Sequence, residues 1–117
     1  MKRKILMVAT AMTLLAGLAF AEDFKSVPVV DVACSSKVKA NPDAHPRECA
    51  LKCQKSGYGI FTSDGRFLKF DAAGNQKITK LLESSKQKDH LRVNVDGQVE
   101  GDTIKVQSVS LSQITQQ

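Results

Sequence analysis

The chain has little aromatic surface and few residues that break secondary structure. Among its 117 residues there is no tryptophan, one tyrosine, five phenylalanines and three prolines. Binding of single-stranded nucleic acid relies on aromatic side chains set among basic ones, and no run of Lys and Arg follows the first few residues. These shortages argue against a nucleic-acid partner.

Sequence motifs of common catalytic sites are missing as well. The cysteines are not spaced as Cys-x-x-Cys, the signature of thiol oxidoreductases. Ser56 precedes a glycine but lacks the Gly-x-Ser-x-Gly context of a hydrolase nucleophile. No glycine-rich phosphate loop occurs either. The sequence therefore favours a role in binding or structure over an enzymatic one.

A long uncharged run occurs only at the N-terminus. Residues 2–4 read Lys-Arg-Lys, residues 5–21 carry no charge, and residues 19–21 read Ala-Phe-Ala, a small-x-small cleavage pattern. A membrane anchor is the alternative, because the 17 uncharged residues approach the roughly 20 that a bilayer requires. The Ala-Phe-Ala site and the polar Glu22-Asp23 that follows it favour removal instead. The pattern predicts a signal peptide over residues 1–21 that is cleaved on export. We therefore expect a periplasmic or secreted protein without a permanent membrane anchor.

The predicted mature chain is short and nearly neutral. Cleavage after residue 21 leaves 96 residues and lowers the formal charge from +5 to +2. A chain of this length supports one domain with a modest core. We expect a single domain over residues 22–111 and a frayed tail over residues 112–117. Nothing in the sequence indicates a particular oligomeric state.

Five segments have the composition of β-strands. Two of them flank Ser63-Asp64-Gly65, a sequence typical of a tight hairpin turn. In the last strand, Ile104 and Val106 share one phase of alternation and Val109 and Leu111 share the other, which predicts a β-bulge. The predicted strands cover residues 27–34, 57–62, 66–70, 91–99 and 104–111.

Two short helices are predicted between the strands. The first spans Pro46 to about Lys55, with His45 as its N-cap and Gly57 as its left-handed terminator. A polar loop, residues 35–43, precedes it. The second helix is capped by Asn75 and ends near Ser85. Its apolar stripe consists of Ile78, Leu81 and Leu82.

The order of these elements predicts the fold class. Strand, helical insert, strand, strand, helix, strand and strand is the order of the five-stranded OB-fold, in which a helix joins strands three and four. We therefore expect a mainly β protein with two short helices, built as a small OB-fold-like barrel.

The three cysteines are Cys34, Cys49 and Cys53. Export compartments are oxidising, and a small core gains stability from a cross-link. Cys49 and Cys53 lie four residues apart on the predicted helix, so a bond between them would distort it. We therefore expect a disulfide from Cys34 to either Cys49 or Cys53, with the remaining thiol packed as a small apolar side chain.

Two alternatives give the same residues a chemical role. His45, Cys49, Cys53 and Cys34 would together bind a soft metal ion such as zinc or copper(I), because thiolate and imidazole ligands suit those ions. Alternatively, the unpaired cysteine is a redox thiol whose pKa is lowered by Arg47, Lys52 or a helix N-terminus. Cys49, in the first turn of the predicted helix, is better placed for that role than Cys53.

Aromatic residues of the second strand are candidates for a binding surface. OB-folds bind extended ligands on a barrel face, and Tyr58 and Phe61 lie in the second strand. Because their phases of alternation differ, one of the two must point into the barrel. The predicted partner is an envelope protein or a small ligand.

Several motifs resemble a known group of proteins. Cys34, the segment Asp-Ala-His-Pro-Arg-Glu-Cys-Ala-Leu-Lys-Cys at 43–53, Lys-Ser-Gly-Tyr-Gly at 55–59, Asp-Gly-Arg-Phe-Leu-Lys-Phe at 64–70 and Val-Glu-Gly-Asp-Thr-Ile-Lys-Val at 99–106 resemble small exported bacterial OB-fold-like proteins. The resemblance covers nearly the whole mature chain. It implies an exported barrel with a His/Cys insert, and it implies no particular activity.

Overall fold

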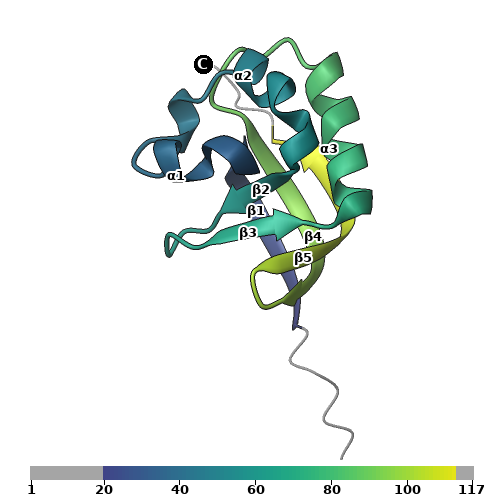
Figure 1. Cartoon of the computed structure of the whole chain (residues 1–117). Helices are drawn as coiled ribbons and strands as arrows, with labels where there is room; N and C mark the ends of the chain where they lie inside the picture. The colour runs from purple at the N-terminus through teal and green to yellow at the C-terminus, as the bar shows by residue number, and fades with distance from the viewer. Residues whose placement is uncertain (1–19, 113–117) are drawn as a thin grey trace, which may run out of the picture.

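Five strands close into a barrel in the computed structural model, which describes residues 20–112 (Figure 1). The strands are β1 (Phe20–Asp31), β2 (Tyr58–Phe61), β3 (Phe67–Phe70), β4 (Arg92–Glu100) and β5 (Thr103–Leu111). Between β1 and β2, the helices α1 (Ser35–Val38) and α2 (Arg47–Lys52) alternate with the 3-10 turns η1 (Val32–Cys34), η2 (Pro42–Ala44) and η3 (Gln54–Ser56). A third helix, α3 (Ala72–Ser84), follows β3.

The strand order identifies the barrel as OB-fold-like and confirms the predicted fold class. Around the barrel the order is β1-β2-β3-β5-β4. β3 and β5 are parallel, and every other neighbouring pair is antiparallel. The helix α3 joins β3 to β4, as the sequence predicts.

The predicted bulge in the last strand is present. Asp96 of β4 pairs with Ser108 and Gly97 pairs with Val106, so Gln107 is the extra residue. A Cβ atom at Gly97 would collide with the backbone carbonyl of Lys105. At Gly97 the two strands therefore approach one another too closely for any side chain, which only glycine permits.

The barrel interior is the hydrophobic core. Alternate residues of β4 point inward, as the period-two pattern requires, and α3 adds Ile78 and Leu82 from one end. The buried cluster consists of Val29, Ala50, Tyr58, Ile60, Leu68, Phe70, Ile78, Leu82, Leu91, Val93, Val95, Val99, Ile104 and Val106.

The helix α3 begins earlier than predicted. Asp71, not Asn75, is its N-cap, and the Asp71 carboxylate accepts a hydrogen bond from the Gly74 amide at 2.9 Å. Asn75 lies inside the helix, where its Oδ1 accepts a bond from the Tyr58 amide at 2.9 Å. Each side chain accepts a hydrogen bond from a backbone amide. The amide bonded to Asp71 belongs to α3 itself, whereas the amide bonded to Asn75 belongs to β2.

The first strand differs most from its prediction. β1 begins seven residues earlier than expected, and residues 20–28 pair with β4 through a bulge between Phe24 and Val27. Polar and charged residues interrupt the apolar alternation in this segment, so its composition does not indicate a strand. Its pairing with β4, about 70 positions away along the chain, is not visible in the local sequence either. The strand also ends at Asp31, and Val32–Cys34 form a 3-10 turn instead.

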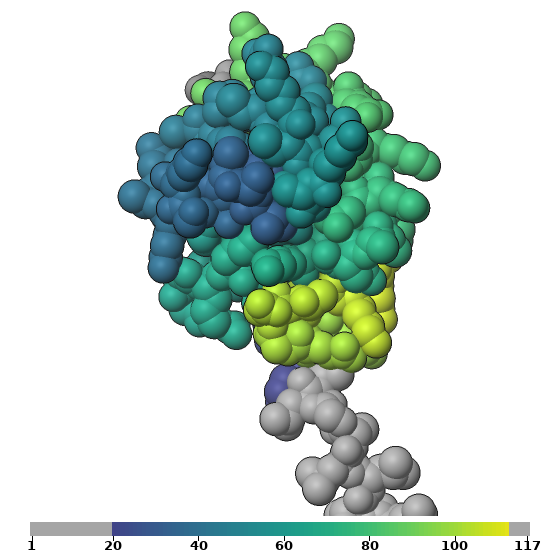
Figure 2. All heavy atoms as spheres, in the orientation of Figure 1, coloured from purple at the N-terminus to yellow at the C-terminus, as the bar shows by residue number. Residues whose placement is uncertain are grey.

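Residues 32–57, called the insert below, connect β1 to β2 and cover one side of the barrel (Figure 2). The segment predicted as a polar loop contains α1 and η2. The predicted helix is divided into α2 and η3, and Pro46 rather than His45 precedes it. Gly57 has a φ of +81° and ends the insert as predicted.

Two predictions concern parts of the chain outside the described residues. The proposed signal peptide falls on residues 1–19 for the most part, and the tail on residues 113–117. Phe20 and Ala21, on the leader side of the predicted cleavage site, pair with Val99 and Gln98 of β4. Within residues 20–112, every helix is too short or too polar to span a bilayer.

Candidate functional site

The junction between β1 and the insert holds a fully buried carboxylate. Asp31, the last residue of β1, has a relative exposure of 0 %. One of its oxygens, Oδ2, accepts a hydrogen bond from the Cys34 amide at 3.0 Å. The other, Oδ1, lies 2.6 Å from Nε2 of His45. Both carboxylate oxygens are therefore used, as a charge without contact to water requires.

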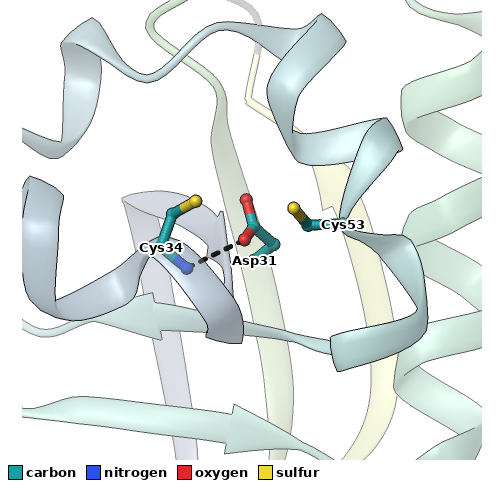
Figure 3. A group of neighbouring side chains, drawn as sticks. All are labelled: Asp31, Cys34 and Cys53. Atoms are coloured by element: carbon teal, nitrogen blue, oxygen red, sulfur yellow. Dashed lines mark hydrogen bonds between the residues drawn. The ribbon is translucent and has the colours of Figure 1, made fainter.

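Two sulfur atoms lie beside this carboxylate. One ligand atom each from Asp31, Cys34 and Cys53 falls within 4.8 Å of the other two. Figure 3 shows the Cys34 and Cys53 side chains pointing toward one another across the Asp31 carboxylate. We call these three residues the thiol cluster. β1, the turn η1 and the end of α2 each contribute one of its members.

The structure separates the three cysteines by environment. All three are free thiols, and the sulfurs of the thiol cluster are farther apart than a disulfide bond of about 2.05 Å. Cys34 and Cys53 are half-buried, whereas Cys49 is exposed. Cys49 is therefore not the buried apolar thiol that the sequence analysis expected to remain.

The thiol of Cys34 is a poor nucleophile in this environment. Burial raises its pKa above the ordinary value, and the hydrogen bond and negative charge of Asp31 raise it further, as does Cys53. Reactive cysteines have lowered pKa values, usually because a cation or a helix N-terminus is near. The environment of Cys34 is the opposite of the one that a redox thiol needs.

His45 is not the N-cap of α2, as predicted, but the C-cap of the preceding turn η2. It is 6 % exposed and faces Asp31, and its backbone amide donates to the Pro42 carbonyl at 3.1 Å. Its ring therefore touches the thiol cluster through Asp31. A histidine that hydrogen-bonds a carboxylate in this way fixes the orientation of the carboxylate. In metal sites, residues that hydrogen-bond the ligands commonly have this role.

Asp31, the central residue of this site, is not among the site residues predicted from the sequence. The signal was present, because Asp31 interrupts the apolar run Val-Pro-Val-Val-Asp-Val at residues 27–32. A single carboxylate inside such a run either points into the protein or marks the end of the strand. Asp31 does both, since it is buried and is the last residue of β1. Its partners were hidden, because His45 and Cys53 are 14 and 22 positions away.

Tyr58 and Phe61 have different surroundings. Tyr58 is 0 % exposed, and its hydroxyl donates to the Ala50 carbonyl of α2 at 2.8 Å. Tyr58 is thus the residue of the two that points into the barrel, as the opposite phases of Tyr58 and Phe61 require. Its hydrogen bond attaches the insert to the barrel. Phe61 is 7 % exposed, packs on Phe67 with ring centroids 5.0 Å apart, and lines a surface cavity.

Two arginines hold the outer side of the insert. The Arg92 guanidinium makes a bidentate pair with Asp43, with Nε to Oδ1 at 3.0 Å and Nη2 to Oδ2 at 2.7 Å. This hydrogen bond, opposed in part by burial, raises the pKa of Arg92. Arg47 donates from Nε to the Gln87 carbonyl at 3.1 Å, and its amide bonds the Lys88 carbonyl at 2.7 Å.

These observations define a small OB-fold-like barrel whose insert carries two thiols beside a buried carboxylate. Comparison of the chain with protein-family models, with curated proteins and with solved structures finds no match. The fold and the site are therefore the basis for any function.

Proposed function

We propose that this protein is an exported, non-enzymatic binding or structural module of the bacterial envelope, and that a Cys34–Cys53 disulfide links the two ends of its insert, joining the turn that follows β1 to the end of α2. The observation that supports this pairing is the distance within the thiol cluster, whose ligand atoms lie within 4.8 Å of one another. A bond requires the two sulfurs to move from this separation to about 2.05 Å.

The exposure of the third cysteine favours this pairing over the one with Cys49. Cys49 is exposed on α2 and is not a member of the thiol cluster. Closing the loop from Cys34 to Cys53 would stabilise the protein by about 3 kcal/mol, chiefly by restricting the unfolded chain. The bond forms when the two thiols lose two electrons and two protons to the thiol oxidants of the export compartment.

A soft-metal site is the second candidate, and the buried Asp31 carboxylate favours it. The donor set is Asp31, Cys34 and Cys53, with His45 behind the carboxylate. Two thiolates and a carboxylate suit zinc better than copper(I), which prefers sulfur ligands alone. The negative charge of Asp31 raises the pKa of Cys34, and a bound cation would reverse that effect by binding the thiolate. Cys49 has no part in this site.

Thiol redox chemistry is the least supported of the alternatives. The raised pKa of Cys34 lowers the fraction of thiolate. Cys49 is exposed and directly follows the acidic Glu48 in the sequence.

Mass spectrometry of the protein purified from its export compartment tests the two candidates together. The unreduced, unfolded chain is alkylated and its thiols are counted, while the native protein is analysed for bound zinc and copper. We expect one alkylated residue, Cys49, and no stoichiometric metal. The variant Cys49→Ser should then show no alkylation, whereas Cys34→Ser should expose Cys53 as a free thiol.

The other outcomes are equally decisive. One equivalent of zinc that is lost in Asp31→Asn, with three thiols alkylated after chelation, would establish the metal site instead. Three alkylated thiols with no metal would overturn both candidates. A Cys34–Cys49 bond in the peptide map would overturn the proposed pairing alone.

A further inference from the structure

A surface cavity has a lining that includes no residue of the thiol cluster. It has a volume of about 360 Å³ and is enclosed by the bulge of β1, the start of β4, the turn between β2 and β3, and the insert between α1 and η2. Figure 1 shows α1 and the β2–β3 turn on the same side of the barrel. The lining residues that matter below are Lys25, Val27, Lys39, Pro42, Phe61 and Arg92.

The charged residues around this cavity are all cationic. Lys25, Lys39 and Arg92 line it, and no Asp or Glu does. Within residues 20–112, no carboxylate lies within ion-pair distance of Lys39, whereas the Lys25 ammonium is 3.3 Å from Asp23. Lys39 is therefore the cation most available to a ligand.

Arg92 retains donors for a ligand despite its partners. It uses one N–H on each oxygen of Asp43 and one on the Ser26 carbonyl, the last at 2.6 Å. A guanidinium has five N–H groups, so two remain. Because Asp43 and Ser26 fix its orientation, these donors are held in place before any ligand arrives.

The cavity also has an apolar wall. Phe61 is 7 % exposed, and Val27 and Pro42 are half-buried beside it. The wall is held in shape by Ser26, which has a φ of +48° and whose amide donates to Asn94 Oδ1 at 2.9 Å. Such a conformation costs free energy in a residue other than glycine, and it directs Lys25 and Val27 toward the cavity.

A neighbouring cavity offers a control for the role of charge. It also measures about 360 Å³ and shares Lys25, Val27 and the turn residues Thr62 and Ser63. Its other lining residues include Glu22, Asp23 and Asp64 as well as Arg66. An anion is therefore favoured in the first cavity and opposed in the second.

We propose that the cation-lined cavity binds a small organic anion, with its carboxylate between Lys39 and Arg92 and its apolar body against Phe61 and Pro42. The inference adds a ligand class to the binding module proposed above. It shares no residue with the thiol cluster, so its failure would leave the cysteine results unaffected.

Titration of the mature protein with benzoate, followed by amide NMR, tests this site. We expect shifts confined to residues 25–28, 39–42, 61–65 and 92. Benzamide, which has the same shape without the charge, should bind more weakly, and so should inorganic sulfate, which lacks the apolar body. Lys39→Ala should weaken benzoate binding roughly three- to fivefold, the effect of one partly exposed charge. The matched control is Lys37→Ala, two positions away and outside the cavity.

Several results would contradict the proposal. It fails if benzoate causes no localised shifts up to tens of millimolar, or if benzamide binds as well as benzoate. It fails equally if the shifts lie around Glu22 and Asp64, or if Lys37→Ala and Lys39→Ala reduce binding alike. Because both lysines are exposed, neither variant should affect folding.

Discussion

The barrel and the insert are stabilised by different kinds of interaction. The barrel buries a continuous apolar cluster, drawn from all five strands and α3. Of the insert's 26 positions, only His45, Ala50 and Gly57 are buried. Ala50 and Leu51 of α2 pack against the core. The other attachments of the insert are hydrogen bonds and an ion pair, between Asp31 and His45, Tyr58 and Ala50, and Arg92 and Asp43.

This difference indicates which conditions each region responds to. Apolar burial depends little on pH or salt, so the barrel should tolerate changes in both. Polar contacts depend on protonation and screening, and the two thiols add oxidation state. The insert should therefore loosen under conditions that leave the barrel folded, and its local opening should require less free energy than global unfolding.

The largest effect is expected from a truncation inside the barrel. Ile104 is 0 % exposed in β5, and Ile104→Ala removes buried methyl groups and leaves a cavity. We expect a loss of about 2 to 5 kcal/mol in the free energy of unfolding, measured by urea denaturation followed by circular dichroism. The exposed neighbour Lys105 provides the control, since Lys105→Ala should change stability by less than about 0.5 kcal/mol. Equal losses would contradict the assignment of the core.

The next largest effect should be confined to the insert. Asp31→Ala removes the acceptor for both His45 and the Cys34 amide and leaves these groups buried without a partner. We expect a loss of about 2 to 3 kcal/mol. In hydrogen exchange, protection should fall over residues 34–56 and persist in β4 and β5. Asp31→Asn, which keeps an acceptor, should lose less. Uniform loss of protection across the chain would show that insert and barrel unfold as one unit.

Alkaline pH should release the insert through Tyr58. Burial raises the pKa of this tyrosine from 10.0 to about 12. The folded protein thus holds the phenol proton more tightly than the unfolded chain does. The resulting stability is complete below pH 10 and is lost as the pH rises through about 12. Tyr58 is the single tyrosine of the chain, so absorbance at 295 nm reports it alone.

The variant Tyr58→Phe checks this interpretation. It removes the hydrogen bond to the Ala50 carbonyl and should cost about 1 kcal/mol at neutral pH. It should also abolish the tyrosine contribution to alkaline unfolding. A midpoint near 10 for the wild-type phenol would mean that the ring is accessible to water.

The smallest effect should come from the ion pair at the rim of the insert. Asp43 and Arg92 are 23 % and 31 % exposed, so solvent screens part of their attraction. We expect Asp43→Ala to cost about 1 kcal/mol at low salt and less at 1 M NaCl. Thermal unfolding at the two salt concentrations measures the difference. A cost that does not change with salt would assign the loss to packing instead.

Local signals were sufficient where a pattern lies within one element. Alternation in β4, the Asp-Gly turn before β3 and the phase slip in β5 all predicted what the structure contains. Helix α3 was predicted with the correct buried face, although its N-cap is Asp71 and not Asn75. Both residue types cap helices, so sequence alone does not distinguish them.

The candidate site was predicted only in part. Cys34, Cys53 and His45 were all singled out, but Asp31, which contacts Cys34 and His45, was not. Cys49 was expected to share the site and is exposed instead. Spacing by four residues places two side chains on the same side of a helix. Here Cys53 caps the C-terminal end of α2 and its amide donates to the Cys49 carbonyl at 3.2 Å, yet Cys53 is half-buried beside Asp31 whereas Cys49 is exposed.

The sequence by itself determined the barrel, because period-two alternation and turn residues are local signals. They can be read from neighbouring residues without knowing which distant strand each one pairs with. Only the tertiary structure decided which polar side chains meet. The pairing of residues 20–28 with β4, the burial of Asp31 against His45 and the approach of Cys34 to Cys53 depend on closure of the barrel. Closure brings together residues whose separation along the chain carries no periodic signal.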